Sequence, residues 1–398
     1  MDKRVERKII MRKFDKAGMF MDNLVSEGKV AGCSVKVVLE NKVVYEHYTG
    51  YADLKDQIPI EETTLFRIYS MTKPVTVTAA LQLYEQGKFL LNDPVAEYLP
   101  EFKEMQVCIP EQKGGYKLVP AKREIQIKDL FCMTSGFTYD GNSCLTERLT
   151  GKLLQTLYQN FEKTSCPTRE FVRKIATLPL AFEPGTRWRY GLSHDVLGGL
   201  IEVLSGQKFG EYVKEHIFDP LFMADTAFHM GQEKLGRLAS VYTYQDGKLL
   251  PRTDIFQKNY TMKSMCESGG AGLVSSLADY VKFASALTNG GTSAEGTKIL
   301  GKQTVDLMRR DHLGRLYQYM DWKVLSGYSY GLGVRTLAYP EEGGVNGTIG
   351  EFGWSGMAGT YVLMDPEKAL TIVYMQQLVP SREDWIHPRL RNIIYSCL

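Results

Sequence analysis

Ser70 and Lys73 stand three residues apart, where the apolar run Leu65-Phe66-Arg67-Ile68 gives way to a helix-forming stretch. On a helix, positions i and i+3 share a face, so the lysine ammonium group reaches the serine hydroxyl group. A serine becomes a nucleophile when a neighbouring base removes its proton, and lysine is an alternative to histidine in that role. The pair therefore indicates acyl transfer through a covalent intermediate on Ser70.

The pattern Ser-x-x-Lys occurs twice more, starting at Ser26 and at Ser205. Each of these matches contains a glycine, Gly28 or Gly206, directly after an apolar helical pattern, which is typical of the end of a helix. Only Ser70 stands where a helix begins, so Ser70 is the candidate nucleophile.

The composition is that of a soluble globular protein, with 398 residues, 44% hydrophobic and 24% charged. Its 48 basic and 46 acidic residues give a formal net charge of +2 without a basic stripe, which argues against nucleic acid as a partner. No apolar run approaches the roughly 18–20 residues that span a bilayer. The basic start lacks the apolar core of a secretory signal, because Arg12 and Lys13 interrupt Ile9-Ile10-Met11. We therefore expect no membrane partner.

Cysteine and histidine are placed without any metal-binding spacing. The seven cysteines form no Cys-x-x-Cys pair, which favours reduced thiols and a cytoplasmic location. The six histidines are scattered, so we expect no metal site. The glycine-rich stretch 268–273 lacks the Gly-Lys-Ser/Thr ending of a phosphate loop and is interpreted as a turn. No cofactor is predicted.

The order of elements predicts the fold. Helical periodicity marks 5–28, and valine-rich alternation predicts a hairpin over 33–48. Residues 101–121 are expected to be irregular, and further helices are predicted at 71–87, 150–162, 168–178, 193–206, 208–217 and 276–287. The tail predicts three strands and a helix, at 328–335, 359–365, 370–376 and 382–395. Both termini supply sheet and helix, so the sequence predicts an α/β (α+β) sandwich whose antiparallel sheet is flanked by terminal helices, with a mostly helical region inserted in the middle.

This architecture, with Ser70 and Lys73 at its crossover from strand to helix, resembles the serine β-lactamase and penicillin-binding-protein superfamily. The class C β-lactamases and their family VIII carboxylesterase relatives are the most similar branch. The resemblance covers one domain over about 16–390, with its α/β part at 1–70 and 270–398 and its helical part at 71–269. It rests on motifs in family order: 66–73, 93–95, 133–136, 184–186, 190–193 and 352–356.

The resemblance implies that Tyr190 is a second candidate base beside Ser70 and Lys73. Both the lysine and the tyrosine have pKa values near 10 in water, so the pKa of either must be lowered by its surroundings for it to act as a base at neutral pH. We expect an adjacent Lys73 ammonium group to lower the pKa of Tyr190. The sequence leaves open which of them takes the first proton. The family's Tyr-x-Asn motif has Leu192 in place of the asparagine, and Ser193 is a weak substitute for it.

The resemblance also gives roles to Trp354-Ser355-Gly356, where β-lactam-handling members have Lys-Thr-Gly on an edge of the sheet. The backbone N–H of Met357 is expected to join that of Ser70 as the second oxyanion donor. A lysine at position 354 would bind a substrate carboxylate, and Trp354 lacks that charge. Trp354 therefore points away from penicillins and D-Ala-D-Ala peptides and towards neutral esters. The expected partner is a small-molecule ester or amide substrate.

Two apparent motifs are set aside. Gly353-Trp354-Ser355-Gly356-Met357 lacks the final glycine of a nucleophile elbow. His194 and Asp195 are adjacent on a predicted helix and face different directions, so they do not suit one triad, and His194 is expected on the surface or on a pocket wall.

The sequence thus predicts a serine hydrolase, carboxylesterase-like and β-lactamase-related, that forms an acyl-enzyme. Activity as a β-lactamase or D-amino-acid peptidase on the same site is the alternative. A non-catalytic binding protein on this scaffold is disfavoured, because Ser70, Lys73 and Tyr190 are all present. The oligomeric state and the physiological substrate stay open.

Overall fold

An eight-stranded antiparallel sheet forms the centre of the protein. The computed structural model describes residues 13–111, 115–159, 166–253, 266–320 and 322–398. The strand order is β10-β11-β12-β13-β14-β1-β2-β3. The strands are β1 (Gly32–Leu39), β2 (Lys42–Asp53), β3 (Ile58–Pro59), β10 (Tyr328–Tyr330), β11 (Arg335–Leu337), β12 (Phe352–Ser355), β13 (Tyr361–Asp365) and β14 (Leu370–Gln376). The two ends of the chain meet in this sheet, because β1 pairs with β14, as predicted.

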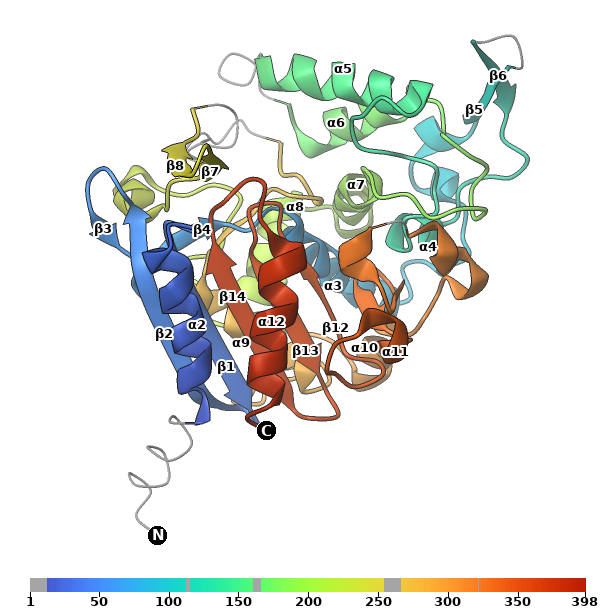
Figure 1. The fold of residues 1–398 in the computed structure, drawn as a ribbon. Helices are drawn as coiled ribbons and strands as arrows, with labels where there is room; N and C mark the ends of the chain where they lie inside the picture. The colour runs from blue at the N-terminus through green and yellow to red at the C-terminus, as the bar shows by residue number, and fades with distance from the viewer. Residues whose placement is uncertain (1–12, 112–114, 160–165, 254–265, 321) are drawn as a thin grey trace.

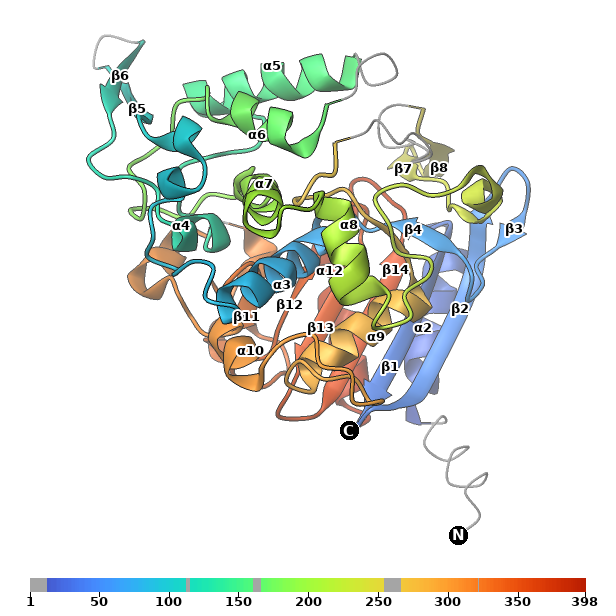
Figure 2. The same cartoon turned by 180° about the vertical axis from the view of Figure 1, so that it is seen from behind.

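Helices cover both faces of the sheet. Helices α2 (Asp15–Ser26) and α12 (Glu383–Tyr395) lie on the face turned to the viewer in Figure 1, and α9 (Leu277–Thr288) lies on the other face, seen in Figure 2. Side chains alternate between the two sides of a strand. On β14, Ile372 and Tyr374 join the core under α2 and α12, whereas Val373 and Met375 join the larger core under α9. Each face is therefore apolar, and the sandwich forms.

The helical segments lie above the upper end of the sheet in Figure 1 and extend down its rear face, where Figure 2 shows α3 and α8 near α9. They are α3 (Thr72–Glu85), α4 (Ile127–Phe131), α5 (Leu145–Gln159), α6 (Thr168–Ile175), α7 (Ser193–Ser205) and α8 (Phe209–Val213), which continues as a short π-helix, η4 (Lys214–Phe218). The predicted helical residues 5–12 and 160–162 lie outside the described residues. The smaller elements are α10 (Lys302–Met308), α11 (Pro340–Gly343) and the 3₁₀ turns η2 (Val95–Glu97), η3 (Pro100–Phe102), η5 (Gln232–Arg237), η7 (Gly314–Tyr319) and η8 (Lys323–Leu325).

Several strands differ from the prediction. Residues 101–121 are not irregular throughout, because β5 (Gln106–Pro110) and β6 (Tyr116–Pro120) form a hairpin. A second hairpin, β7 (Tyr242–Gln245) with β8 (Lys248–Pro251), was not predicted. In the tail, the predicted strand 328–335 is two strands, β10 and β11, since Gly333 adopts a positive φ of 74° and the chain turns there.

Strand β4 (Leu65–Arg67) leads directly to Ser70 and pairs with β9 (Val274–Ser276) in a separate two-stranded sheet. Gln377, at the end of β14, holds the main chain of Arg67 in both directions. Its amide oxygen accepts from the Arg67 N–H at 3.1 Å, and its amide nitrogen donates to the Arg67 carbonyl at 3.0 Å. The central sheet thereby fixes the segment that precedes the candidate nucleophile.

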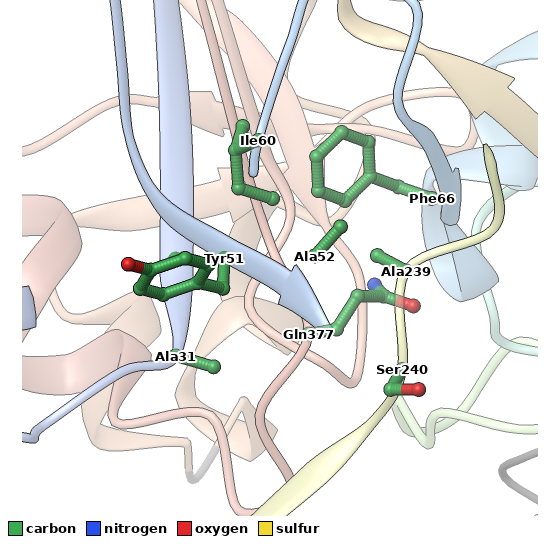
Figure 3. A pocket seen from close by; sticks show the side chains of 9 residues that line it. Ala31, Tyr51, Ala52, Ile60, Phe66, Ala239, Ser240 and Gln377 are labelled. Atoms are coloured by element: carbon green, nitrogen blue, oxygen red, sulfur yellow. The ribbon is translucent and has the colours of Figure 1, made fainter. Parts of the chain in front are cut away.

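A small pocket lies beside this junction (Figure 3). Its volume of about 10 Å³ is room for roughly one water molecule. Ala31, Gly32, Tyr51, Ala52, Ile60, Phe66, Ala239, Ser240 and Gln377 line it. None of the predicted site residues is among them, so this pocket is separate from the candidate site.

Candidate active site

The candidate nucleophile stands on a strained turn. Ser70 is the middle residue of the 3₁₀ turn η1 (Tyr69–Met71), which runs straight into α3. Tyr69 has a φ of +42°, a value that bulky residues avoid. The buried Tyr280 hydroxyl donates to the Met71 carbonyl at 2.7 Å, and Ile68 N–H donates to the Leu273 carbonyl at 3.1 Å. Packing therefore holds the backbone in this conformation, as is common at active sites.

Lys73 lies in the first turn of α3, three residues after Ser70, and is completely buried. Its Nζ donates to Ser70 Oγ at 3.3 Å, to the Tyr139 hydroxyl at 3.1 Å and to the Gly270 carbonyl at 2.7 Å. It also lies 4.4 Å from the centre of the Tyr190 ring. The predicted reach of the lysine to the serine is present in the structure.

Burial lowers the pKa of Lys73 to about 7, although the negative charge of Asp195 acts in the opposite direction. Removing a charged amine from water favours its neutral form, which is the form that accepts a proton. A substantial share of Lys73 is therefore neutral at neutral pH.

Tyr190 lies on the other side of Ser70. Its hydroxyl accepts a hydrogen bond from Trp354 Nε1 at 3.0 Å, and it is hydrogen-bonded to the Ser70 side chain. Burial raises the pKa of Tyr190 above its usual range in spite of both hydrogen bonds. The expected lowering of the Tyr190 pKa is therefore wrong, because desolvation by burial dominates and the phenol stays protonated. The Tyr190 ring also packs against Trp188 and Trp322.

Two of the sequence motifs contact each other. The Ser135 hydroxyl lies 2.8 Å from the Ser193 hydroxyl, and the Tyr139 N–H donates to the Tyr190 carbonyl at 3.4 Å. Leu192 is buried in the core, and Ser193 is bonded to Ser135, so Ser193 does not replace the family's asparagine. The contacts to Lys73 come instead from Tyr139 and Gly270. Neither contact was predicted from the sequence, since nothing in the spacing of Tyr139 or Gly270 from Ser70 indicates it.

The strand that carries Trp354 is an inner strand of the sheet, not an edge. Its register explains how it still faces the nucleophile. Strand β11 pairs only with Phe352 and Gly353, so the end of β12 has β13 on one side and η1 on the other. Gly356 packs on the carbonyl of Ile68, closer than a Cβ atom would allow. This contact brings the end of β12 beside the turn that carries the nucleophile.

The third predicted segment is thus placed beside Ser70. Trp354 is bonded to Tyr190, and Ser355 is partly exposed. Met357, the expected second oxyanion donor, follows Gly356, and its side chain is 51% exposed. Its role as a donor stays a prediction.

Glu383, the first residue of α12, was not singled out from the sequence. Its side chain is hydrogen-bonded to Ser355, and its charge contributes to the raised pKa of Tyr190. Burial raises the pKa of Glu383. Arg335 also interacts electrostatically with Glu383, but its guanidinium group donates to the Val362 carbonyl. The Glu383 carboxyl group therefore lies beside Ser355, next to position 354, where a cation would be needed to bind a substrate carboxylate.

His194 and Asp195 diverge, as their adjacency predicts. His194 is in the core rather than on the surface or a pocket wall, and burial lowers its pKa to about 3, so it is neutral. Its Nε2 lies 3.3 Å from the Phe131 carbonyl. Asp195 faces the turn that contacts Lys73, because its Oδ1 accepts from Ser268 Oγ at 2.5 Å and from Gly270 N–H at 3.3 Å.

Among the described residues, no three His, Cys, Asp or Glu side chains gather as metal ligands would. Within the same part of the chain, no helix is long and apolar enough to cross a membrane.

A serine beside a buried lysine, at the start of a helix next to an antiparallel sheet, is the arrangement of the Ser-x-x-Lys acyl-transfer enzymes. Residues 17–393 match the family model described as Beta-lactamase. The chain therefore belongs to the beta-lactamase family, and it is a serine hydrolase of that family.

Known proteins support this assignment over most of their lengths. The Mycobacterium tuberculosis (strain H37Rv) protein Rv1367c is 30% identical over 360 residues, which cover 89% of this chain and 87% of that protein. Esterase EstB of Burkholderia gladioli is 26% identical over 375 residues, with 89% and 88% covered. The solved structure of EstCE1, described as a hydrolase with promiscuous acyltransferase activity, shares the fold with a TM-score of 0.80 at 23% identity, covering 98% of this chain and 100% of EstCE1.

Proposed function

We propose that the protein hydrolyses small carboxylic esters through an acyl-enzyme on Ser70. The observation that carries this proposal is the hydrogen bond of 3.3 Å between Ser70 Oγ and Lys73 Nζ, a buried amine with a pKa of about 7. Esterase EstB, whose similarity extends over 89% of the chain, bears an esterase name, which supports the same activity.

Lys73 is the first base in this proposal. Its neutral amine takes the proton of Ser70 Oγ as the oxygen attacks the ester carbonyl. Tyr190 acts as a neutral phenol, because its pKa is raised. It gives its proton to the leaving alcohol, and the proton on Lys73 restores it. Water then releases the acid, with the same two residues moving the proton.

The oxyanion of the tetrahedral intermediate is stabilised by the backbone N–H groups of Ser70 and Met357 in this proposal. The close packing of Gly356 on Ile68 supports it, because that contact brings the two main-chain segments together. Each such donor is worth about 2.7–4 kcal/mol of transition-state stabilisation.

Family membership favours a second candidate, hydrolysis of β-lactams or D-amino-acid peptides at the same Ser70. Two observations rank it below ester hydrolysis. Trp354 and Ser355 carry no positive charge that could bind a substrate carboxylate. The Trp354 N–H is also already bonded to Tyr190, and Ser355 is bonded to the Glu383 carboxyl group.

The test compares a short-chain p-nitrophenyl ester with a chromogenic cephalosporin on the purified protein. We expect faster turnover of the ester and its loss in Ser70→Ala, with Ser205→Ala, from one of the other Ser-x-x-Lys matches, as the matched control. Ester hydrolysis that survives in Ser70→Ala would refute the nucleophile. A cephalosporin turned over faster than the ester would reverse the order of the two functions.

We also propose that residues 16–390 form one functional unit and that it works in the cytoplasm. All seven cysteines lie in the described part of the chain and none of them forms a disulfide there, which supports a reducing compartment. Detection of the native protein in a non-cytoplasmic cell fraction would contradict this location.

A further inference from the structure

A buried carboxylate lies behind the base of the proposed reaction. Asp195, on α7, is 2% exposed. Its Oδ1 is bonded to Ser268 and to Gly270 N–H, whereas its Oδ2 has no hydrogen-bond partner among the described residues. Burying a carboxylate oxygen without a hydrogen-bond partner costs free energy of folding, which suggests that this carboxylate has a function.

The turn that Asp195 holds is the one that holds Lys73. Ser268 N–H donates to the Cys266 carbonyl, and the turn continues through Gly269 and Gly270. Side chains at the start of α3 fix the turn from the other side. Thr76 Oγ1 donates to the Gly269 carbonyl at 2.7 Å, and Lys73 Nζ donates to the Gly270 carbonyl at 2.7 Å.

Glycine is needed at position 270. A Cβ atom there would lie 2.7 Å from Asp195 Oδ2 and 2.8 Å from the Tyr139 hydroxyl. Real Cβ atoms do not approach so closely. Gly270 therefore lies against both Asp195 and Tyr139, and its N–H and carbonyl are bonded to Asp195 and Lys73.

We propose that Asp195 is a positioning residue for Lys73. Its carboxylate fixes Gly270 by accepting from the N–H of that residue, and it supplies a negative charge that faces the ammonium group across Gly270. The Gly270 carbonyl in turn holds the lysine beside Ser70. This role rests on the proposed function, in which Lys73 is the base.

The groups that face Asp195 are consistent with this role. The charge of Asp195 raises the pKa of Lys73, the cation on α3. The neighbouring His194 is neutral, and Tyr139 and Tyr190 present phenol groups. Burial raises the pKa of Asp195, whereas the Ser268 hydrogen bond and the charge of Lys73 act to lower it. The charged form of Asp195 acts on Lys73 and opposes the effect of burial on the pKa of that lysine.

The experiment compares wild type with Asp195→Asn, which keeps the shape and removes the charge. The measured quantity is the acid limb of the pH profile for the reaction of Ser70 with a fluorophosphonate, a single covalent step. We expect the limb to move to lower pH by about one unit, since a nearby opposite charge shifts a pKa by roughly 1–3 units. A purely structural loss would lower the rate at every pH and leave the limb in place.

Glu202→Gln is the matched control, because Glu202 is on the same helix and its carboxyl group accepts from Phe209 N–H at 3.0 Å. It is expected to leave the limb unchanged. Should Asp195→Asn fail to fold, Ser268→Ala gives the same direction by less, because it removes a donor that keeps Asp195 ionised. An unmoved limb in the folded Asp195→Asn protein, or in Ser268→Ala, would overturn the proposal.

A second measurement separates this inference from the proposed function. The pKa of Lys73 is followed by NMR of ¹⁵N-lysine-labelled Ser70→Ala protein, with the signal assigned by its absence in Lys73→Met. Asp195→Asn is expected to lower this pKa even if the protein hydrolyses no ester. An unchanged pKa refutes the role of Asp195, whereas a lowered pKa without ester turnover refutes only the function.

Discussion

The rate of ester hydrolysis should rise between about pH 5 and pH 9, following the loss of one proton, from Lys73, near pH 7. The proposed base, Lys73, is active only as the neutral amine. Its pKa falls from 10.5 to about 7 in the folded protein, which corresponds to roughly 5 kcal/mol in favour of the neutral form. About one tenth of the lysine is then neutral at pH 6, half at pH 7 and about nine tenths at pH 8. The value of kcat/KM should therefore be about tenfold higher at pH 8 than at pH 6.

The assay follows release of p-nitrophenol from a short-chain ester, at substrate concentrations well below KM and with the spontaneous rate subtracted. Using kcat/KM matters because its pH dependence reports the ionisations of the free enzyme. The matched variant is Lys73→Arg, which keeps a cation in the site but cannot lose its proton near neutral pH. We expect its activity to fall by at least about 10² across the whole range, without a limb near pH 7.

The opposite assignment gives a different curve. If a Tyr190 phenolate took the first proton, the rate would keep rising beyond pH 9, because burial raises the pKa of that phenol. A profile that shows no plateau by about pH 9 would refute the reasoning about Lys73. A limb near pH 7 that persists in Lys73→Arg would refute it as well.

Three further outcomes follow from the same contacts. Lys73→Met should abolish activity and raise the free energy of unfolding by up to about 5 kcal/mol near pH 6, measured by urea unfolding. This gain should shrink by about 1.4 kcal/mol per pH unit above pH 7, because between about pH 7 and 10 the unfolded chain binds the lysine proton and the folded protein does not. A gain that grows with pH would contradict the sign. Trp354→Phe removes the N–H that binds the Tyr190 hydroxyl and should lower kcat about tenfold, whereas Trp322→Phe, which loses only a ring contact, should change it less. Equal losses would remove the hydrogen bond from the mechanism. Glu383→Gln should raise kcat/KM for an ester that carries a carboxylate about fivefold relative to a neutral ester, since about 1 kcal/mol of repulsion is lost; no change in that ratio would place Glu383 outside the substrate's reach.

Local patterns in the sequence predicted the main helices and the strands of the sheet's centre. Alternating apolar residues of β1 and β14 pack on both faces, and Gly206 ends α7 in a left-handed conformation, so the serine before it closes a helix as expected. The hairpin β5–β6 was missed because most side chains of its two strands are exposed, so alternation is weak there. It is held in part by a long-range contact, between Cys108 N–H and the Leu180 carbonyl at 2.8 Å.

The site was predictable where residues sit in motifs and unpredictable where they meet through the fold. Ser70, Lys73, Tyr190 and Trp354 were found by type and order. Tyr139 and Gly270 are 66 and 197 residues from Lys73, and no local signal connects them to it. The pKa of Tyr190 was predicted in the wrong direction for a related reason. The sequence shows a nearby cation, but it does not show how much water the fold removes from the phenol.

In the proposed reaction, the position of Asp195 adjusts the pKa of the lysine base. A carboxylate in direct contact with the ammonium group would raise its pKa far above neutral, and the lysine would stay protonated. Complete removal of negative charge would leave the buried amine with a pKa too low to accept a proton strongly. Within the described residues, no carboxylate forms an ion pair with Lys73, and Gly270 lies between Lys73 and Asp195, bonded to both. In the proposed reaction, the separation that Gly270 keeps between the two charges limits the strength of their interaction, and with it the pH at which Ser70 reacts.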